Sequence, residues 1–440
     1  MNDIIIIGGG IAGATAAVEC ARRGREVILI EENQIGGVCL NQGCIPTKTM
    51  LHFLRLAQKA ERAAAEGIFA GSVNVELKGL QAYTKERLAQ LRYGMRYQLK
   101  KAGVKLLTAR AEKEADGSVS LFHGDGEKEV LEPPSILIHA EGADWSAQRS
   151  ILPPLYREAG TDGNSMQEIL MPEDLLTMDA VPETVSVIGA GVTGVECAMI
   201  LSALGSRVSL YEKRDCILEE FGTDAVRLVE NQLEEAGISL YKGKEAVPHS
   251  GAADRVIWCG GSRKRKDGGA APGQECCAGT GIIAGKGRIP QEYEIGDVRD
   301  DCSLASTARY QAIKMVQKIF GETEIEPVVI PDVVYAPFPV ARAAVPEKGR
   351  RRDREAAGKS DYYSCAAAEM TGETTGFVKV WADSRTGELK EILIAGEGAD
   401  LMIGEAAVLV QNHMTSFQLK STVHPHPSLC EALAECVEKL

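Results

Sequence analysis

Two stretches of the chain repeat one pattern: a short apolar strand, three glycines at fixed spacing, a helix, a second strand and an acidic residue. The first copy predicts a strand over residues 3–7, a helix over 14–23 and a strand over 26–30. This order is that of a dinucleotide-binding βαβ unit, in which the glycines make a tight turn, admit the pyrophosphate and let the helix pack on the strand, while the acid holds a ribose hydroxyl. The residues in these roles are Gly8, Gly10, Gly13 and Glu31.

The second copy predicts strands over residues 185–188 and 208–211, joined by a glycine turn and a helix. Its acid, Glu212, favours the free 2′-hydroxyl of NAD and would repel the 2′-phosphate of NADP, although Lys213 and Arg214 follow it directly and weaken this preference. The chain is therefore predicted to bind two dinucleotides. The glycines of the second copy are Gly189, Gly191 and Gly194.

Composition limits the classes of protein that the chain can belong to. Its 440 residues suffice for about three domains, and its 45% hydrophobic content suffices for packed cores. The net charge of −13 argues against nucleic acid or an anionic membrane as a partner. No apolar run approaches the roughly 20 residues of a membrane helix, and the chain starts in a strand without a signal peptide, so we expect a cytoplasmic protein. The 12 cysteines lack the spacing of a disulfide scaffold or a zinc site, and no metal is expected.

One close cysteine pair, Cys39 and Cys44, follows the first dinucleotide unit. Pro46 and Thr47 come directly after it and read as the opening of a helix. A helix start favours the thiolate form of a cysteine, so a disulfide here would open and close easily. The alternative is a pair of buried structural cysteines, which the nearby nucleotide fingerprint makes the weaker interpretation.

The run from Gly36 to Lys48 resembles, nearly residue for residue, the active-site disulfide of the pyridine nucleotide:disulfide oxidoreductase family, and within it most closely that of the dihydrolipoyl dehydrogenases. The resemblance covers residues 1–440 and rests on several separate motifs. It implies that Cys39 and Cys44 form a redox-active disulfide beside a flavin. It also implies that the first dinucleotide unit binds the ADP half of FAD and the second binds NAD.

Three further motifs extend the resemblance to the surroundings of the flavin. Glu196 is similar to the family glutamate that pairs with the lysine after the disulfide, here Lys48, although a glutamate at a helix start can also simply interact with the helix dipole. The run ending in Gly142 resembles a family crossover, with Glu141 in place of threonine. Asp297 resembles the aspartate that accepts hydrogen bonds from the ribitol of FAD.

The tail of the chain resembles the family's catalytic histidine motif, departing from it at Ser428 and Cys430. His426 lies between two prolines, and its unperturbed pKa of about 6.5 suits it to accept or donate a proton. Glu431 could orient the imidazole, as a triad carboxylate does. The other histidines that lack such a context, His52, His139 and His413, are interpreted as structural.

The resemblance implies an α/β fold with two Rossmann-like dinucleotide-binding domains and a C-terminal α+β dimerisation domain. We expect a discontinuous FAD-binding domain over residues 1–148 and 286–324, an NAD-binding domain over 149–285 and a dimerisation domain over 325–440. In the family the histidine of one subunit serves the disulfide of the other, so a homodimer is expected. The basic run over 348–359 is interpreted as a solvated loop.

The second dinucleotide domain departs from the family pattern. Family members usually carry a three-stranded meander before the strand at residues 255–258, whereas here only a short link over 242–254 remains. The domain is therefore expected to be trimmed. The glycine-rich run that follows contains adjacent cysteines, Cys276 and Cys277, which are interpreted as an incidental pair, although vicinal thiols can be redox-active.

The resemblance implies flavin-dependent oxidation of protein-bound dihydrolipoamide to lipoamide, with reduction of NAD+. The catalytic residues would be Cys39, Cys44, Lys48, Glu196, His426 and Glu431. Because no lipoyl-bearing domain is seen in the chain, we expect that group on a partner from a 2-oxo acid dehydrogenase or glycine cleavage system. One alternative is an NAD(P)H-dependent reductase of another disulfide; a second, of a different class, is a low-turnover flavoprotein that acts as a binding subunit.

Overall fold

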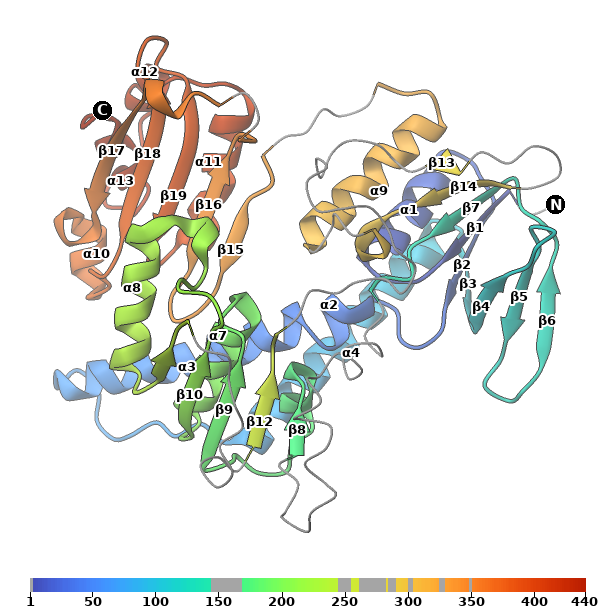
Figure 1. Ribbon diagram of the computed structural model, residues 1–440, viewed down its shortest axis with the longest axis horizontal. Helices are drawn as coiled ribbons and strands as arrows, with labels where there is room; N and C mark the ends of the chain where they lie inside the picture. Colours follow the sequence, from blue (N-terminus) through green and yellow to red (C-terminus); the bar gives the residue numbers. More distant parts are fainter. Residues whose placement is uncertain are drawn as a thin grey trace.

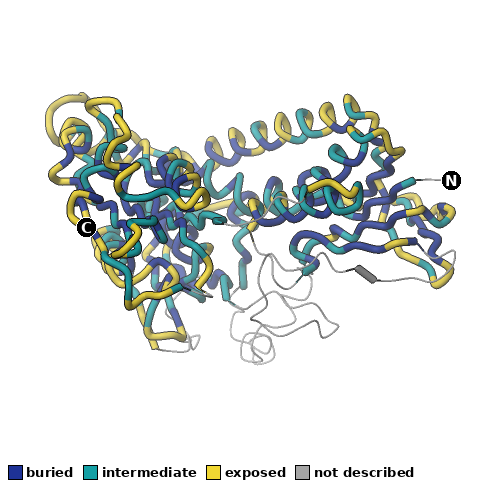
Figure 2. The backbone as a smooth tube through the Cα atoms, turned by 90° about the horizontal axis from the view of Figure 1, so that it is seen from above, coloured by how far each residue is buried: buried dark blue, intermediate teal, exposed yellow. Residues whose placement is uncertain are grey.

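The computed structural model describes residues 3–143, 168–243, 255–260, 282–283, 290–299, 304–323, 329–347 and 350–440. The chain forms three main sheets, with the strands of the second lying in sequence between two parts of the first, and helices pack against each of them (Figure 1). Buried residues lie mainly on the strands and on the inner faces of the helices, and exposed ones on the outer turns and loops (Figure 2). No helix among the described residues combines the length and apolar character needed to cross a membrane.

The first sheet has six strands in the order β13-β14-β7-β1-β2-β3. Its central strand β1 consists of four buried isoleucines, as expected for a strand of a sheet that is covered on both faces. Ile4 and Ile6 pack with helices α1 and α9, and Ile5 and Ile7 pack with a separate three-stranded antiparallel sheet, β4-β5-β6. The bounds are β1 Ile4–Ile7, α1 Ile11–Arg22, β2 Val27–Glu31, β3 Lys105–Thr108, β4 Arg110–Lys113, β5 Val119–Phe122, β6 Lys128–Leu131, β7 Ile136–His139, β13 Ile282–Ile283, β14 Gln291–Glu294, η3 Gly296–Val298 and α9 Ala305–Ile319.

The second sheet has five strands in the order β11-β10-β9-β12-β8, and all its pairings are parallel. Residues 244–254, most of the link expected to replace the meander, lie outside the described residues, as do Cys276 and Cys277. The bounds are β8 Glu168–Leu170, η1 Pro172–Leu176, β9 Thr184–Ile188, α7 Val192–Ala203, β10 Arg207–Tyr211, η2 Glu219–Phe221, α8 Gly222–Glu235, β11 Ser239–Tyr241 and β12 Arg255–Trp258.

The third sheet is antiparallel, in the order β15-β16-β19-β18-β17. Its strands alternate buried and less buried residues, and helices α11 and α13 contribute to its core. With this sheet, the predicted α/β class with two dinucleotide-binding units and a C-terminal α+β region is confirmed. The bounds are β15 Asp332–Val334, β16 Val340–Ala344, η4 Arg352–Arg354, β17 Glu355–Asp361, η5 Tyr362–Ser364, α10 Ala366–Thr371, β18 Phe377–Asp383, β19 Leu389–Ala395, α11 Ala399–Gln411, α12 Ser416–Lys420 and α13 Glu431–Val437.

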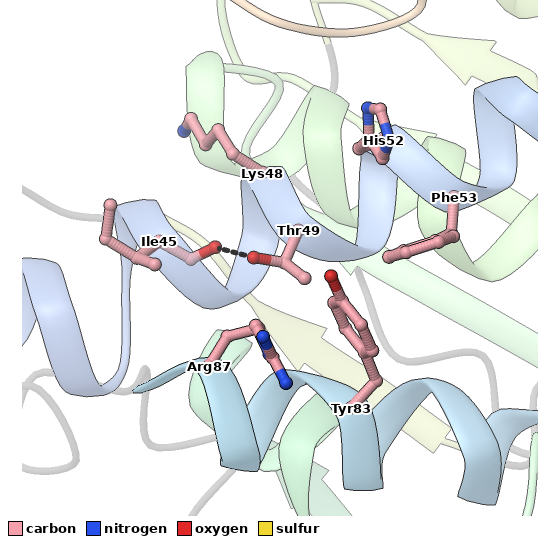
Figure 3. A pocket seen from close by; sticks show the side chains of 7 residues that line it. All are labelled: Ile45, Lys48, Thr49, His52, Phe53, Tyr83 and Arg87. Atoms are coloured by element: carbon pink, nitrogen blue, oxygen red, sulfur yellow. Dashed lines mark hydrogen bonds between the residues drawn. The ribbon is translucent and has the colours of Figure 1, made fainter. Parts of the chain in front are cut away.

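Three helices connect these sheets: α2 Gly37–Asn41, α3 Cys44–Ala65 and α4 Leu77–Lys101. Met50, Leu51 and Leu54 of α3 are buried in one hydrophobic cluster that also contains residues of the second and third sheets. Helix α3 runs alongside α4, and the side chains between them are shown in Figure 3. Because α3 begins at Cys44, two residues before the expected start, the second cysteine lies in its first turn. Helix α2, which contains Cys39, was not predicted from the sequence.

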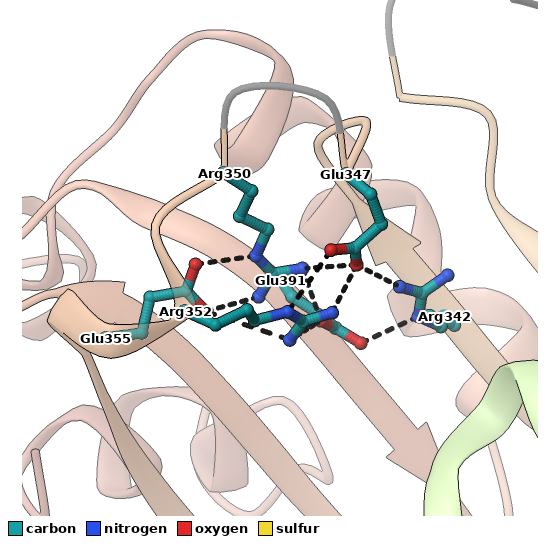
Figure 4. A network of polar contacts seen from close by, with 6 residues as sticks. All are labelled: Arg342, Glu347, Arg350, Arg352, Glu355 and Glu391. Atoms are coloured by element: carbon teal, nitrogen blue, oxygen red, sulfur yellow. Dashed lines mark hydrogen bonds and ion pairs between the residues drawn. The ribbon is translucent and has the colours of Figure 1, made fainter.

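The prediction of a solvated loop over residues 348–359 agrees with Arg351, Arg352 and Asp353, which are exposed, but is wrong for Arg350 and for the strand that begins at Glu355. The side chain of Arg350 is only 1% exposed, and β17 begins at Glu355. Arg350 binds Glu355 and Glu391, both at 2.6 Å, and these two carboxylates are also buried (Figure 4). These charged side chains can be buried because the cation is paired with carboxylates. The sequence pattern alone does not show this pairing. The network is completed by Arg342, Glu347 and Arg352.

Candidate active site

The cysteine pair lies where α2 meets α3, against the first glycine turn. Gly36 and Gly37 start α2 with φ of 106° and 59°, in the left-handed region that favours glycine. A Cβ atom at Gly37 would come 2.9 Å from the Cα of Gly10, so a side chain there would push the two loops apart. The two glycines therefore bring Cys39 and Cys44 next to the turn predicted to bind the pyrophosphate of FAD.

The two thiols are free, half-buried and electrostatically different. The hydrogen bond from Cys39, with a further contribution from the Lys48 ammonium, lowers the pKa of Cys44 to about 6 against the opposing effect of burial. The same hydrogen bond and burial raise the pKa of Cys39. In the dithiol state, Cys44 is therefore the thiolate at neutral pH, and Cys39 keeps its proton.

Lys48 and Glu196 join α3 to α7 beside this thiolate. Their Nζ and Oε2 atoms are 2.7 Å apart, and the Glu196 side chain is only 2% exposed. The other carboxylate oxygen of Glu196 accepts a hydrogen bond from the backbone N–H of Tyr335 at 3.2 Å, and the Lys48 ammonium lies 5.1 Å from the centre of the Tyr335 ring. Burial disfavours the Lys48 cation, but the ion pair with Glu196 outweighs it and raises the pKa of Lys48. The lysine is therefore held as a cation one helical turn from Cys44.

The two predicted dinucleotide units have matching geometry. The Glu31 carboxylate accepts hydrogen bonds from the backbone of Gly9 at 2.7 Å and Asn33 at 2.8 Å. The Glu212 carboxylate accepts them from Ala190 at 2.9 Å and Arg214 at 3.0 Å. An ionised carboxylate has room for about four hydrogen bonds, so each can still accept one from a ribose hydroxyl.

The glycines of both turns are also in place. Gly8 and Gly189 have φ of 102° and 99°. A Cβ at Gly13 or Gly194 would overlap the carbonyl oxygen of the first glycine of its own turn, which explains why helix and strand need glycine there. Apart from its own neighbours in the chain, no atom of the described residues lies within 4 Å of a Cβ built at Gly191, and the nearest to one at Gly10 is 3.8 Å away, so the backbone of both turns is open to a pyrophosphate.

The end of β14 brings Asp297 towards the cysteine pair, since its charge contributes to the raised pKa of Cys39. Before it, Gly296 donates a hydrogen bond to Oε1 of Gln311 at 2.9 Å. Nε2 of Gln311 is buried and has no hydrogen-bond partner among the described residues. A buried donor without a partner is unfavourable, so the residues present here fit a bound group that offers an acceptor, as FAD would. Gly142, three residues after the end of β7, has a φ of 80°.

His426 and Glu431, near the C-terminal end of the chain, form the pair that the sequence predicted. Nδ1 of His426 lies 2.8 Å from Oε1 of Glu431, and Oε2 of Glu431 accepts a hydrogen bond from the backbone of Ser428 at 2.9 Å. The Ser428 N–H and His426 lower the pKa of Glu431, which stays an anion and fixes the imidazole. The His426 side chain is 73% exposed. Helix α13, which begins at Glu431, lies beside the third sheet and well apart from α2 (Figure 1).

A second histidine of the tail, His424, was not singled out by the sequence. Its Nε2 lies 3.0 Å from Oε1 of Glu405, and its Nδ1 is buried without a partner among the described residues. The other histidines have local partners: His139 lies 2.7 Å from Glu141, and His413 lies 2.7 Å from Glu388. In the part of the chain that the structure describes, no group of three or more His, Cys, Asp and Glu side chains is arranged to hold a metal ion.

Comparisons with known proteins agree with this geometry. The family model described as pyridine nucleotide-disulphide oxidoreductase matches residues 2–312, and the model of its dimerisation domain matches 330–437. The dihydrolipoyl dehydrogenase of Bacillus subtilis is 28% identical over 459 residues, covering 99% of this chain and 97% of that protein. The dihydrolipoyl dehydrogenase of Chlorobaculum tepidum is 30% identical over 464 residues, covering 98% and 96%.

Two solved structures share the fold. LpdA from Mycobacterium tuberculosis superposes with a TM-score of 0.82 at 23% identity, covering 100% of this chain and 99% of that one. The HOCl-induced flavoprotein disulfide reductase RclA from Escherichia coli superposes with a TM-score of 0.80 at 19% identity, covering 99% of each. FAD and NAD are the cofactors of the matched family. The chain belongs to the pyridine nucleotide-disulfide oxidoreductases, as a class I flavoprotein with the family's dimerisation domain.

Proposed function

We propose that the chain oxidises dihydrolipoyl groups carried by a partner protein and reduces NAD+, using the Cys39–Cys44 disulfide and FAD. One observation carries the proposal: Cys44, whose pKa is lowered, lies beside the buried Lys48–Glu196 ion pair. This arrangement makes Cys44 a good leaving group when the disulfide is attacked, because a sulfur of lower pKa leaves faster. The two relatives that span nearly the whole chain bear the name dihydrolipoyl dehydrogenase.

The thiol half-reaction follows from these residues. His426 takes a proton from one thiol of the substrate, and the resulting sulfur attacks Sγ of Cys39. The Cys39–Cys44 bond breaks, and its electron pair stays on Cys44 as a thiolate. The second substrate thiol gives its proton to Cys39 as its sulfur attacks the first; the bond between the first sulfur and Cys39 breaks, which releases the cyclic substrate disulfide and leaves Cys39 as a thiol. Two electrons and two protons have left the substrate, and the protein holds the reduced pair.

Bound FAD would supply the transfer of this electron pair from the thiols to NAD+. Glu31, Asp297 and the glycines Gly8, Gly10 and Gly13 would hold the flavin nucleotide, while the second glycine turn and Glu212 would hold NAD. The Lys48 cation favours negative charge beside it, both on Cys44 and on a reduced ring. We propose NAD over NADP because Glu212 accepts backbone hydrogen bonds as an anion and would repel a 2′-phosphate.

The active enzyme is proposed to be a homodimer in which His426 of each chain serves the cysteines of the other. The match to the dimerisation domain and the distance of α13 from α2 both support this arrangement. The proposed domain bounds remain 1–148 with 286–324 for FAD, 149–285 for NAD and 325–440 for the interface. β12 pairs with β9 of the second sheet, whereas β13 at residues 282–283 pairs with β14 of the first sheet, so strand pairing supports a boundary between β12 and β13, before residue 286.

RclA is described as a flavoprotein disulfide reductase. The likeness to it supports a second candidate function, the reduction of another disulfide by NADH or NADPH. Steady-state rates distinguish the two. The proposal expects the fastest turnover with dihydrolipoamide and NAD+, and slower turnover with NADH and the disulfides of glutathione, coenzyme A or thioredoxin. Faster reduction of one of these disulfides would favour the second candidate. A Cys44→Ser variant controls for turnover that bypasses the cysteine pair, and a protein that binds FAD but shows no turnover would point to a binding subunit.

A further inference from the structure

Tyr335 directly follows strand β15 and meets the Lys48–Glu196 pair from the side of the third sheet. Its ring centre lies 5.1 Å from the Lys48 ammonium, and its backbone N–H donates to the Glu196 carboxylate at 3.2 Å. The residues on either side of it, Val334 and Ala336, are 0% and 1% exposed and belong to the same hydrophobic cluster as part of α3. The position of Tyr335 is therefore fixed by buried neighbours, independently of the lysine.

The Glu196 carboxylate alone does not fix the Lys48 ammonium. Lysine has a flexible stem and several N–H donors, and the hydrogen bond to Glu196 at 2.7 Å uses only one of these donors. The face of an aromatic ring carries partial negative charge and attracts a cation, so the Tyr335 ring gives the ammonium a second contact. The ammonium is thereby held by two separate elements, α7 and the segment that follows β15.

The Tyr335 ring supports the cation without neutralising it. Burial raises the pKa of the Tyr335 hydroxyl, and the negative charges of Asp400 and Cys44 add to this effect, so the phenol keeps its proton at neutral pH. A second carboxylate in the same place would cancel the charge of Lys48, whereas a neutral ring leaves it intact. The charge therefore still acts on Cys44, where it adds to the Cys39 hydrogen bond in lowering the pKa of that thiol.

We propose that Tyr335 is a positioning residue for the thiol chemistry, whose ring holds the Lys48 ammonium beside Cys44. Through it, the third sheet contributes to the cysteine site of its own chain. This role rests on the proposed function and deepens it, because it names a residue outside both dinucleotide units on which the Cys44 thiolate depends. Tyr335 acts through Lys48 and not by contact with the substrate.

The pH profile of Cys44 alkylation by iodoacetamide tests this role in the FAD-loaded Cys39→Ser protein. Tyr335→Leu removes the ring but keeps the backbone N–H, and it should move the midpoint upward by about half a pH unit or more. Tyr335→Phe keeps the ring and should restore the midpoint to within about 0.2 pH units. Trp381→Leu is the matched control, because it removes a ring that lies 4.9 Å from Lys379 and packs on the same hydrophobic cluster. The control should leave the midpoint unchanged.

A double-variant comparison shows whether the ring acts through the lysine. In a Lys48→Met background, Tyr335→Leu should cause no further shift of the midpoint. The proposal is overturned by an equal shift with and without Lys48, by no shift in Tyr335→Leu, or by an equal shift in Trp381→Leu.

Fluorinated rings give a second test, which holds even if Tyr335→Leu does not fold. Replacement of Tyr335 by phenylalanine with an increasing number of ring fluorines keeps the shape of the ring and weakens the negative charge of its face. The midpoint should rise with each added fluorine. A midpoint that does not depend on fluorination would overturn the proposal.

Alkylation needs no dithiol substrate, so it separates this role of Tyr335 from the proposed function. If dihydrolipoamide is not oxidised although NADH bleaches the flavin, the proposed function fails, but a Lys48-dependent shift in Tyr335→Leu still supports the positioning role. Normal turnover of dihydrolipoamide with an unmoved midpoint in Tyr335→Leu would overturn the positioning role and leave the proposed function standing. Circular dichroism of each variant checks that it is folded.

Discussion

The ammonium of Lys48 lies 2.7 Å from the Glu196 carboxylate, and this contact links the helix of the cysteine pair to the helix of the second dinucleotide unit. Glu196 is almost fully buried and also receives the N–H of Tyr335, next to the third sheet. One carboxylate therefore joins three parts of the chain that are far apart in sequence. The pair holds a cation beside Cys44, at the place where electrons are proposed to pass between thiols and nicotinamide.

Glu196→Gln tests this contact. The amide can still accept from Tyr335, but Lys48 loses its counter-ion while remaining half-buried, so we expect a loss of about 2 kcal/mol in the free energy of unfolding and slower electron transfer between NADH and the disulfide. Urea unfolding and stopped-flow absorbance measure the two effects. Glu183→Gln, which breaks an exposed pair with Arg207 in the same region, is the control and should change neither. Wild-type behaviour of the Glu196 variant would show that the contact is incidental.

The acidity of Cys44 gives a pH prediction. Its pKa is lowered to about 6, so in the reduced protein it should be a thiolate above that pH and become protonated below it. In a Cys39→Ser variant, whose hydroxyl can still donate to the sulfur, alkylation by iodoacetamide should rise with pH and level off above a midpoint near 6. Lys48→Met should move the midpoint upward, because removal of the cation disfavours the thiolate. A midpoint near the ordinary value of 9 in the single variant would contradict this account.

The role of His426 predicts a split between the two half-reactions. His426→Gln should slow the oxidation of dihydrolipoamide by a factor of about 10² to 10⁴, the usual contribution of a positioned base, while NADH still reduces the flavin at the wild-type rate. His413→Gln is a matched control, because His413 is also exposed and also lies beside a glutamate, at 2.7 Å. Single-turnover absorbance separates the two steps. The assignment is refuted if both half-reactions slow equally, or if the control slows as much as the variant.

The buried network around Arg350 predicts an effect on stability alone. Arg350→Met removes the 2.6 Å partner of buried Glu355 and one of the three cations around Glu391, which keeps Arg342 and Arg352, so we expect a loss of about 3 kcal/mol in the free energy of unfolding. Arg351→Met, one residue along, removes only an exposed pair with Asp353 and should change it by less than about 0.5 kcal/mol. Calorimetry of thermal unfolding compares the stability of the two variants. Similar losses in both would show that the buried network does not stabilise the fold.

The same network has a pH signature. Burial opposes the charged form of Glu391, but Arg342 and Arg350 outweigh it and lower its pKa. A lowered folded-state pKa stabilises the fold at neutral pH, and this contribution is lost as the pH falls through that pKa. The difference in stability between wild type and Arg350→Met should therefore shrink in acid. Urea midpoints measured from neutral pH to well below the ordinary glutamate pKa of 4.5 follow it, and a constant difference would argue against charge pairing as its cause.

Local patterns predicted much of the site. The glycine turns, Glu31 and Glu212 follow from rules of spacing that hold within one βαβ unit, and the model places both carboxylates at their turns. The pairing of His426 with Glu431 was accessible for the same reason, since only five residues separate them. Such motifs are set by contacts close in sequence, so a single chain is enough to recognise them.

Contacts between distant segments were harder to predict. The buried position of Arg350 depends on Glu391, which lies on β19 and is distant in sequence. The basic run alone therefore predicted a solvated loop. The early start of α3 at Cys44 depends on Gly43, whose carbonyl accepts the N–H of Thr47 at 3.2 Å, and not on the proline that marked the expected start.

The central claim is that electrons reach the flavin from a dithiol only through Cys39 and Cys44. Anaerobic titration of the oxidised holoprotein with dihydrolipoamide, followed by its visible spectrum, tests it in wild type and in Cys44→Ser. We predict that the dithiol reduces the wild-type protein, and that in the variant it leaves the flavin oxidised although NADH still bleaches it. Reduction of the variant's flavin by the dithiol at the wild-type rate would contradict the account.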